Sequence, residues 1–72
     1  MVERVLHNYV KAVRLEQGIT QAELAEKIQV SRKTVNTIEN EVFVPSTTVA
    51  LLLASALGKR VEELFYLGDT QC

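Results

Sequence analysis

The feature that most constrains this chain is a pair of short helical segments, residues 20–28 and 31–40, separated by the turn Gln29-Val30-Ser31. The first segment opens on Thr20-Gln21-Ala22-Glu23, a capping box in which Thr20 caps a backbone N–H and Glu23 reaches back to the chain. In both segments apolar residues recur at helical spacing, so one face of each helix packs inward. Two short helices joined by so short a turn indicate a helix-turn-helix.

Three further helical segments flank this pair. Apolar residues at helical spacing predict one helix over residues 8–17, a second over 46–57 and a short last helix over 61–65. Glycines follow the first two of these segments, as is typical of helix ends. We therefore predict an all-α fold, a compact five-helix domain that spans residues 1–72 and has its core in residues 8–67.

Composition limits the function classes. With 72 residues, the chain is near the lower size limit for a hydrophobic core that folds without disulfides or bound metals. Its single cysteine, Cys72, excludes an internal disulfide or a cysteine zinc site. The most apolar run, residues 49–57, is far shorter than the roughly 20 residues that span a bilayer. No catalytic constellation or metal-ligand cluster stands out, and His7 has no partner ligands in the sequence. We expect a cytoplasmic protein without enzyme activity, metal or cofactor.

The second helix of the pair carries a polar outer face. Its side chains suit base edges in the major groove: Arg and Lys donate to guanine, Asn pairs with adenine, and a Thr methyl meets a thymine methyl. Two cations also stand in the first turn, where the helix dipole disfavours them by about 0.3–1 kcal/mol each, and nearby phosphates would reverse that effect. The outer-face residues are Arg32, Lys33, Asn36, Thr37 and Asn40.

Glu39 also opposes the helix dipole, because it is an anion in the last turn. Arg14 in the first helix is its candidate partner. We predict a partly buried ion pair that ties the first helix to the third, so that deleting either residue destabilises the fold more than it affects contact with DNA.

The order and spacing of several short sequence motifs resemble the phage-repressor and Cro type of helix-turn-helix, also called the XRE family. The resemblance covers residues 8–67 and implies a lambda-repressor-like fold and a sequence-specific transcriptional regulator that binds double-stranded DNA. The motifs on which the resemblance rests include Gly18-Ile19-Thr20-Gln21, Leu24-Ala25, Val30-Ser31-Arg32, Val35-Asn36, Ile38-Glu39-Asn40, Pro45-Ser46 and Ala56-Leu57-Gly58.

The resemblance also assigns roles to positions. Gln21 would contact a phosphate and brace the recognition helix, residues 32–40, while Ser31 would cap that helix and touch the DNA backbone. Asn40 falls where the family often contacts phosphate. A homodimer on a near-palindromic operator, with half-sites about one helical turn apart, is implied as well. The residues that would reach base edges are Arg32, Lys33, Asn36 and Thr37.

Several positions depart from the family pattern. Gln29 and Glu41 stand where many members have glycine, so we expect a positive φ at these sites, at a cost of order 1 kcal/mol for a non-Gly residue. Val42 replaces a residue that is commonly basic, and Arg60 replaces a capping Ser or Thr. Phe43 in the same loop either covers the core or takes part in a contact.

Leu51 and Leu52 point away from the inner stripe of their helix. We interpret them as part of a subunit interface, and a wider monomer core is the alternative. The residues that can join this interface are Phe65, Tyr66 and Leu67.

Two other functions stay open. The net charge of −1 and the extra leucines also fit a protein-interaction module, such as an antitoxin that neutralises a partner protein and binds DNA only secondarily. Residues 45–65 are also similar to regulators in which a helix-turn-helix precedes a sensor domain, so the chain can be the DNA-binding part of a larger, ligand-sensing protein.

Overall fold

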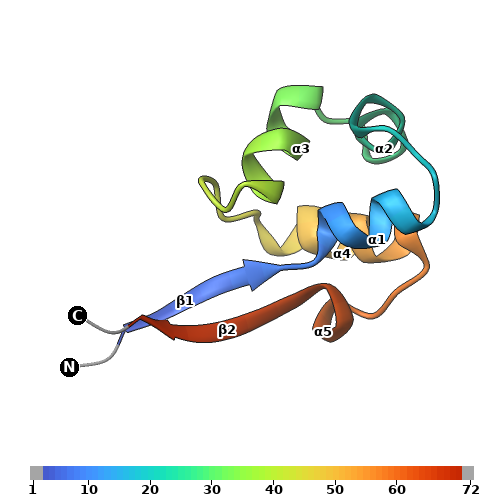
Figure 1. Cartoon of the computed structure of the whole chain (residues 1–72). Coiled ribbons are helices and arrows are strands. Elements are labelled where there is room, and N and C mark those ends of the chain that lie inside the picture. Colours follow the sequence, from blue (N-terminus) through green and yellow to red (C-terminus); the bar gives the residue numbers. More distant parts are fainter. Residues whose placement is uncertain (1–2, 71–72) are drawn as a thin grey trace.

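Along the chain, a strand is followed by five helices and a second strand, and the two strands pair with each other (Figure 1). The computed structural model describes residues 3–70 and the side chains of residues 5–68. The five predicted helices are confirmed, while Cys72 lies outside the described residues. The elements, in chain order, are β1 (Glu3–Asn8), α1 (Val10–Glu16), α2 (Gln21–Ile28), α3 (Arg32–Glu39), α4 (Thr47–Leu57), α5 (Val61–Leu64) and β2 (Phe65–Thr70).

Side-chain caps fix where the central helices begin. The Thr20 hydroxyl accepts from the Glu23 N–H at 3.0 Å, and the Glu23 carboxylate accepts from the Thr20 N–H at 2.9 Å, which completes the predicted capping box. The backbone bond from Thr20, followed by that from its side chain, holds the pKa of Glu23 below its usual value. Ser31 and Ser46 each accept from the N–H three residues on, at 3.1 and 3.2 Å.

The core takes at least one fully buried aliphatic side chain from every helix. Burying a Leu or Val side chain stabilises the fold by about 1.5–3 kcal/mol relative to leaving it exposed. Because α2 and α3 both contribute, the helix-turn-helix is part of the core and is not an appendage. The largest of these side chains are Val10, Leu24, Val35, Ile38, Leu53 and Leu64.

A two-stranded antiparallel sheet, which was not predicted from the sequence, extends the helical domain. β1 and β2 pair with Leu6 opposite Leu67 and Asn8 opposite Phe65, and this two-stranded sheet projects beyond the helices (Figure 1). The Tyr9 N–H donates to the Leu64 carbonyl at 2.8 Å, which continues the pairing into the helices. Consequently α5 ends at Leu64, one residue earlier than predicted, and Phe65 begins a strand.

Close packing between the two strands explains Gly68. A Cβ at this position would lie 2.6 Å from Cδ2 of the His7 ring, so only glycine lets that ring lie against β2. The ring also stacks on Tyr66, with centroids 5.2 Å apart.

Glu41 joins β1 to the end of α3. Its carboxylate lies 3.0 Å from His7 Nδ1 and accepts from the Asn8 N–H at 3.1 Å. Asn8 Nδ2 also donates to the Ile38 carbonyl at 2.9 Å. Glu41 adopts φ 61°, as Gln29 does, so the predicted positive φ at both sites is confirmed.

Within residues 3–70, no helix is both long and apolar enough to cross a membrane.

Candidate nucleic-acid interface

The turn between α2 and α3 sets the direction of α3. Gln29 takes a left-handed conformation, and the Val30 N–H donates to the Ala25 carbonyl at 3.0 Å, while the Val30 side chain packs against the core. Val35 and Ile38 are fully buried and hold α3 to the rest of the domain. The opposite face of α3 is therefore turned away from the core.

That outer face carries the five polar residues singled out in the sequence. Arg32, Lys33 and Asn40 are exposed, and Asn36 and Thr37 are half-buried. The first turn of α3 contains no acidic residue that would neutralise its two cations. The helix thus presents positive charge at its N-terminal end and amide and hydroxyl groups further along.

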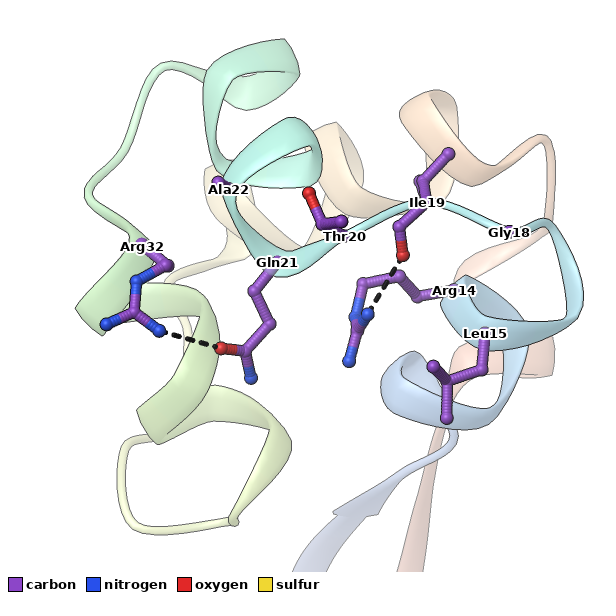
Figure 2. A pocket seen from close by; sticks show the side chains of 8 residues that line it. All are labelled: Arg14, Leu15, Gly18, Ile19, Thr20, Gln21, Ala22 and Arg32. Atoms are coloured by element: carbon purple, nitrogen blue, oxygen red, sulfur yellow. Dashed lines mark hydrogen bonds between the residues drawn. The ribbon is translucent and has the colours of Figure 1, made fainter.

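Gln21, the first residue of α2, spans the gap to α3. Its Nε2 donates to Asn36 Oδ1 at 3.1 Å and to Glu39 Oε1 at 3.0 Å, and its Oε1 accepts from Arg32 Nη1 at 3.4 Å (Figure 2). Asn40 Nδ2 also donates to Asn36 Oδ1, at 3.4 Å. Gln21 therefore braces the outer face of α3 from one side.

An ion pair lies behind this polar network. Arg14 Nε donates to Glu39 Oε2 at 2.7 Å, and Arg14 Nη2 donates to Glu39 Oε1 at 3.2 Å. Arg14 Nη1 donates to the Ile19 carbonyl at 2.9 Å (Figure 2). The two charged side chains are only 8% and 1% exposed, so water contributes little and each charge depends on its partner. The structure thus places the ion pair expected from the sequence between α1 and α3.

A hollow of about 590 Å³ opens between α1 and the N-terminal end of α2. Gln21 and Arg32 line it, and Figure 2 shows the Arg32 guanidinium turned toward the Gln21 amide. The first N–H groups of a helix have no acceptor within the helix, and the helix dipole favours an anion there. The Thr20 hydroxyl already accepts from the Glu23 N–H, so among the described residues the N–H groups of Gln21 and Ala22 are those left at this end of α2 to meet a phosphate oxygen.

A second, smaller hollow flanks α3, and Phe43 in the following loop contributes to it together with Lys33 and Thr37. From the sequence, the role of Phe43 is open between a cover over the core and a contact, and its place beside α3 is not predicted. The signal was available, because Phe43 stands between two valines in a loop. Three consecutive apolar residues are unusual where the backbone is irregular and solvated.

The expected subunit-interface residues divide into two groups. Leu51, Leu52, Tyr66 and Leu67 are 56%, 40%, 41% and 60% exposed. Phe65 requires a correction: it is 8% exposed and packs in the monomer core, because β2 turns it toward the helices. Tyr66 stacks on Tyr9, with centroids 4.8 Å apart.

Among the residues that the structure describes, no three His, Cys, Asp or Glu side chains are grouped so that they could hold a metal ion.

Comparisons with known proteins agree with this geometry. A family model described as helix-turn-helix matches residues 10–64. The uncharacterized HTH-type transcriptional regulator YgzD of Bacillus subtilis (strain 168) is 37% identical over 64 residues, which are 89% of this chain and 97% of that protein. The immunity repressor protein of Bacillus phage phi105 is 38% identical over 55 residues, 76% of this chain and 38% of the repressor. A crystal structure of a protein from Bacteroides fragilis has a similar fold, with a TM-score of 0.79, 24% identity and coverage of 86% of this chain and 100% of that one.

Proposed function

The chain belongs to the helix-turn-helix family of DNA-binding transcriptional regulators, and from this premise we propose that the outer face of α3 reads base edges in the major groove of a specific DNA site. The observation that carries the proposal is the polar outer face of α3, with Arg32 and Lys33 exposed at its start and Gln21 bracing it. No acidic side chain in that first turn opposes an approaching phosphate backbone.

The hydrogen bonds of the free protein suggest how each side chain would read a base. Arg32 and Lys33 carry donors for guanine O6 and N7. Asn36 Oδ1 already accepts from Gln21 and Asn40, whereas its Nδ2 makes no hydrogen bond within the described residues. We infer that Asn36 donates to a purine N7, and that bidentate pairing with adenine requires one of these two donors to leave Oδ1.

Contacts with phosphates would set the register of α3 in the groove. Gln21 lies at the N-terminal end of α2, beside the hollow that Arg32 also lines, and this end suits an anion. Ser31 at the start of α3 and Asn40 after its end are exposed, so both can meet the DNA backbone. Binding is therefore expected to weaken as salt is raised.

We further propose that the protein acts as a homodimer in the cytoplasm, on a near-palindromic operator. The exposed side chains of Leu51, Leu52, Tyr66 and Leu67 support a subunit interface, because a monomer gains nothing from leaving them in water. Dimers of this type bind half-sites about one helical turn of DNA apart, so the proposal requires the two-fold interface to hold the two α3 helices at that spacing. The proposed activity is binding, not catalysis.

The same exposed leucines favour a second candidate function. A protein partner that covers Leu51 and Leu52 would make the chain an antitoxin-like interaction module, or the DNA-binding part of a larger regulator with a sensor domain. The two candidates differ in what the isolated chain does, since only the first requires it to discriminate between DNA sequences.

Amide chemical-shift mapping with duplex DNA tests the proposal. We expect the largest perturbations at Arg32–Glu39 and at the first residues of α2, and they should shrink as salt is raised. Perturbations confined to α4 and β2, or none at near-millimolar DNA, would contradict it.

A further inference from the structure

The loop after α3 carries three consecutive exposed apolar side chains that the base contacts proposed above do not use. Val42, Phe43 and Val44 are 78%, 50% and 66% exposed. Water around apolar side chains is unfavourable, so a run of this kind in a small soluble domain indicates a contact surface.

The loop holds Phe43 at a fixed place relative to α3. The Thr37 carbonyl accepts from the N–H groups of Val42 and Phe43 at 3.0 and 3.2 Å. The preceding residue, Glu41, donates its N–H to the Ile38 carbonyl at 3.0 Å and is also bonded to β1 through its side chain. The Phe43 ring is thus presented by ordered backbone beside the recognition helix, and binding need not order it.

Phe43 and one flank of α3 enclose a hollow of about 200 Å³, which is lined by Ser31, Lys33, Thr34, Thr37 and Phe43. The hydroxyl groups in it are bonded within α3: Ser31 Oγ and Thr34 Oγ1 lie 2.9 Å apart, and Thr37 Oγ1 donates to the Thr34 carbonyl at 2.9 Å. The hollow therefore offers a ring, methyl groups and the Lys33 stem, and suits an apolar group.

We propose that this hollow takes the C5-methyl group of a thymine, so that Phe43 reads one base of the operator. The inference rests on the proposed function, because it requires α3 in the major groove. Lys33 and Thr37 line the hollow and also belong to the outer face of α3, so a base that they contact lies beside Phe43. The thymine methyl is the apolar group that base edges present in the major groove.

Replacing single thymines by deoxyuridine tests the proposal, because this change removes only the methyl group. The operator is first obtained by selection from random duplex DNA. Each thymine is then replaced in turn, and affinity is measured for the wild-type chain, Phe43→Ala and the matched loop control Val44→Ala. The fold of each variant is checked by circular dichroism and thermal unfolding.

We expect one thymine in each half-site at which deoxyuridine weakens wild-type binding by roughly fourfold, the effect of one buried methyl group. Phe43→Ala should bind the thymine operator more weakly and lose the difference between the two bases, whereas Val44→Ala should keep it. A wild-type chain that binds its operator but shows no thymine dependence overturns this inference alone. So does a Phe43→Ala variant that keeps the full dependence. A wild-type chain that binds no DNA overturns the proposed function as well.

Discussion

Arg14 of α1 holds the Glu39 carboxylate at the end of α3 through two hydrogen bonds of 2.7 and 3.2 Å, and both side chains are almost fully shielded from solvent. Arg14→Met leaves the Glu39 charge buried without its partner. We expect the free energy of unfolding to fall by about 3–5 kcal/mol, as is usual when a buried pair loses one member. Urea denaturation measures it.

The double variant Arg14→Met/Glu39→Leu separates this explanation from simple loss of packing. Because it removes both charges, it should be more stable than Arg14→Met alone. Lys11→Ala, at an exposed position of α1, should stay within about 0.5 kcal/mol of the wild type. A double variant as unstable as Arg14→Met would show that the charges are not what matters.

Lys33 is exposed and lies on the outer face of α3, so its side chain can be removed without loss of core packing. Lys33→Ala should weaken binding to the selected operator by about 1–3 kcal/mol at fixed salt and leave the unfolding midpoint nearly unchanged. Asn36→Ala should weaken binding similarly. Fluorescence anisotropy titration measures both, with Lys27→Ala as the surface control. Unchanged affinity for Lys33→Ala would show that Lys33 does not contact the bases.

Gln29 and Glu41 share a φ of 61° but differ in what their side chains do. Gln29→Gly should stabilise the protein by up to about 1 kcal/mol, because glycine adopts this conformation without the steric cost. Glu41→Gly relieves the same cost but removes the bonds to His7 and Asn8, so its gain should be smaller or reversed. Thermal unfolding distinguishes them; equal gains would mean that the Glu41 side chain contributes nothing.

Acid should loosen the contact between Glu41 and β1. The hydrogen bonds from His7 and then from the Asn8 N–H hold the pKa of Glu41 below its usual value. A carboxyl group with a lowered folded-state pKa stabilises the fold fully above its unfolded pKa and loses that effect as pH falls through the folded value. The stability difference between wild type and Glu41→Gln should thus be present in full at neutral pH and shrink as the pH falls toward about 3. A difference independent of pH would contradict this, and Glu62→Gln serves as the exposed control.

A substitution at Leu52 tests the subunit interface. Leu52→Lys places a charge in the proposed contact, and since a two-fold interface contains each residue twice, the dimer dissociation constant should rise by more than about tenfold. Sedimentation equilibrium measures it. Leu15→Lys, at a position 59% exposed on α1, is the matched control. Equal dissociation constants for the two variants would place the interface elsewhere.

The helices were predictable because their determinants are local. Thr20, Ser31 and Ser46 cap helices within three residues of themselves, so sequence spacing alone identifies where these helices begin. The ion pair was predictable for a different reason, since Glu39 opposes the helix dipole unless a cation such as Arg14 is near. The family resemblance then gave the outer face of α3 its function.

The two-stranded sheet and the place of Phe43 were not predictable in this way. β1 and β2 come from opposite ends of the chain, so no turn sequence between them predicts their pairing. The pairing depends on α1 and α5, which bring the two ends together. Phe65 was expected on a surface because its helix was extended one residue too far. Phe43 reaches the flank of α3 only through the turn at Glu41, a conformation that the sequence suggests but whose direction it does not give.

Selection of binding sites from random-sequence duplex DNA, at stated salt, tests sequence reading by α3 most directly. The wild-type chain should retain a near-palindromic consensus with half-sites about one helical turn apart, and Lys33→Ala should lose preference at one base pair of each half-site. Recovery of no consensus, with only weak and salt-sensitive retention that is the same for Lys33→Ala, would contradict sequence-specific recognition by this helix.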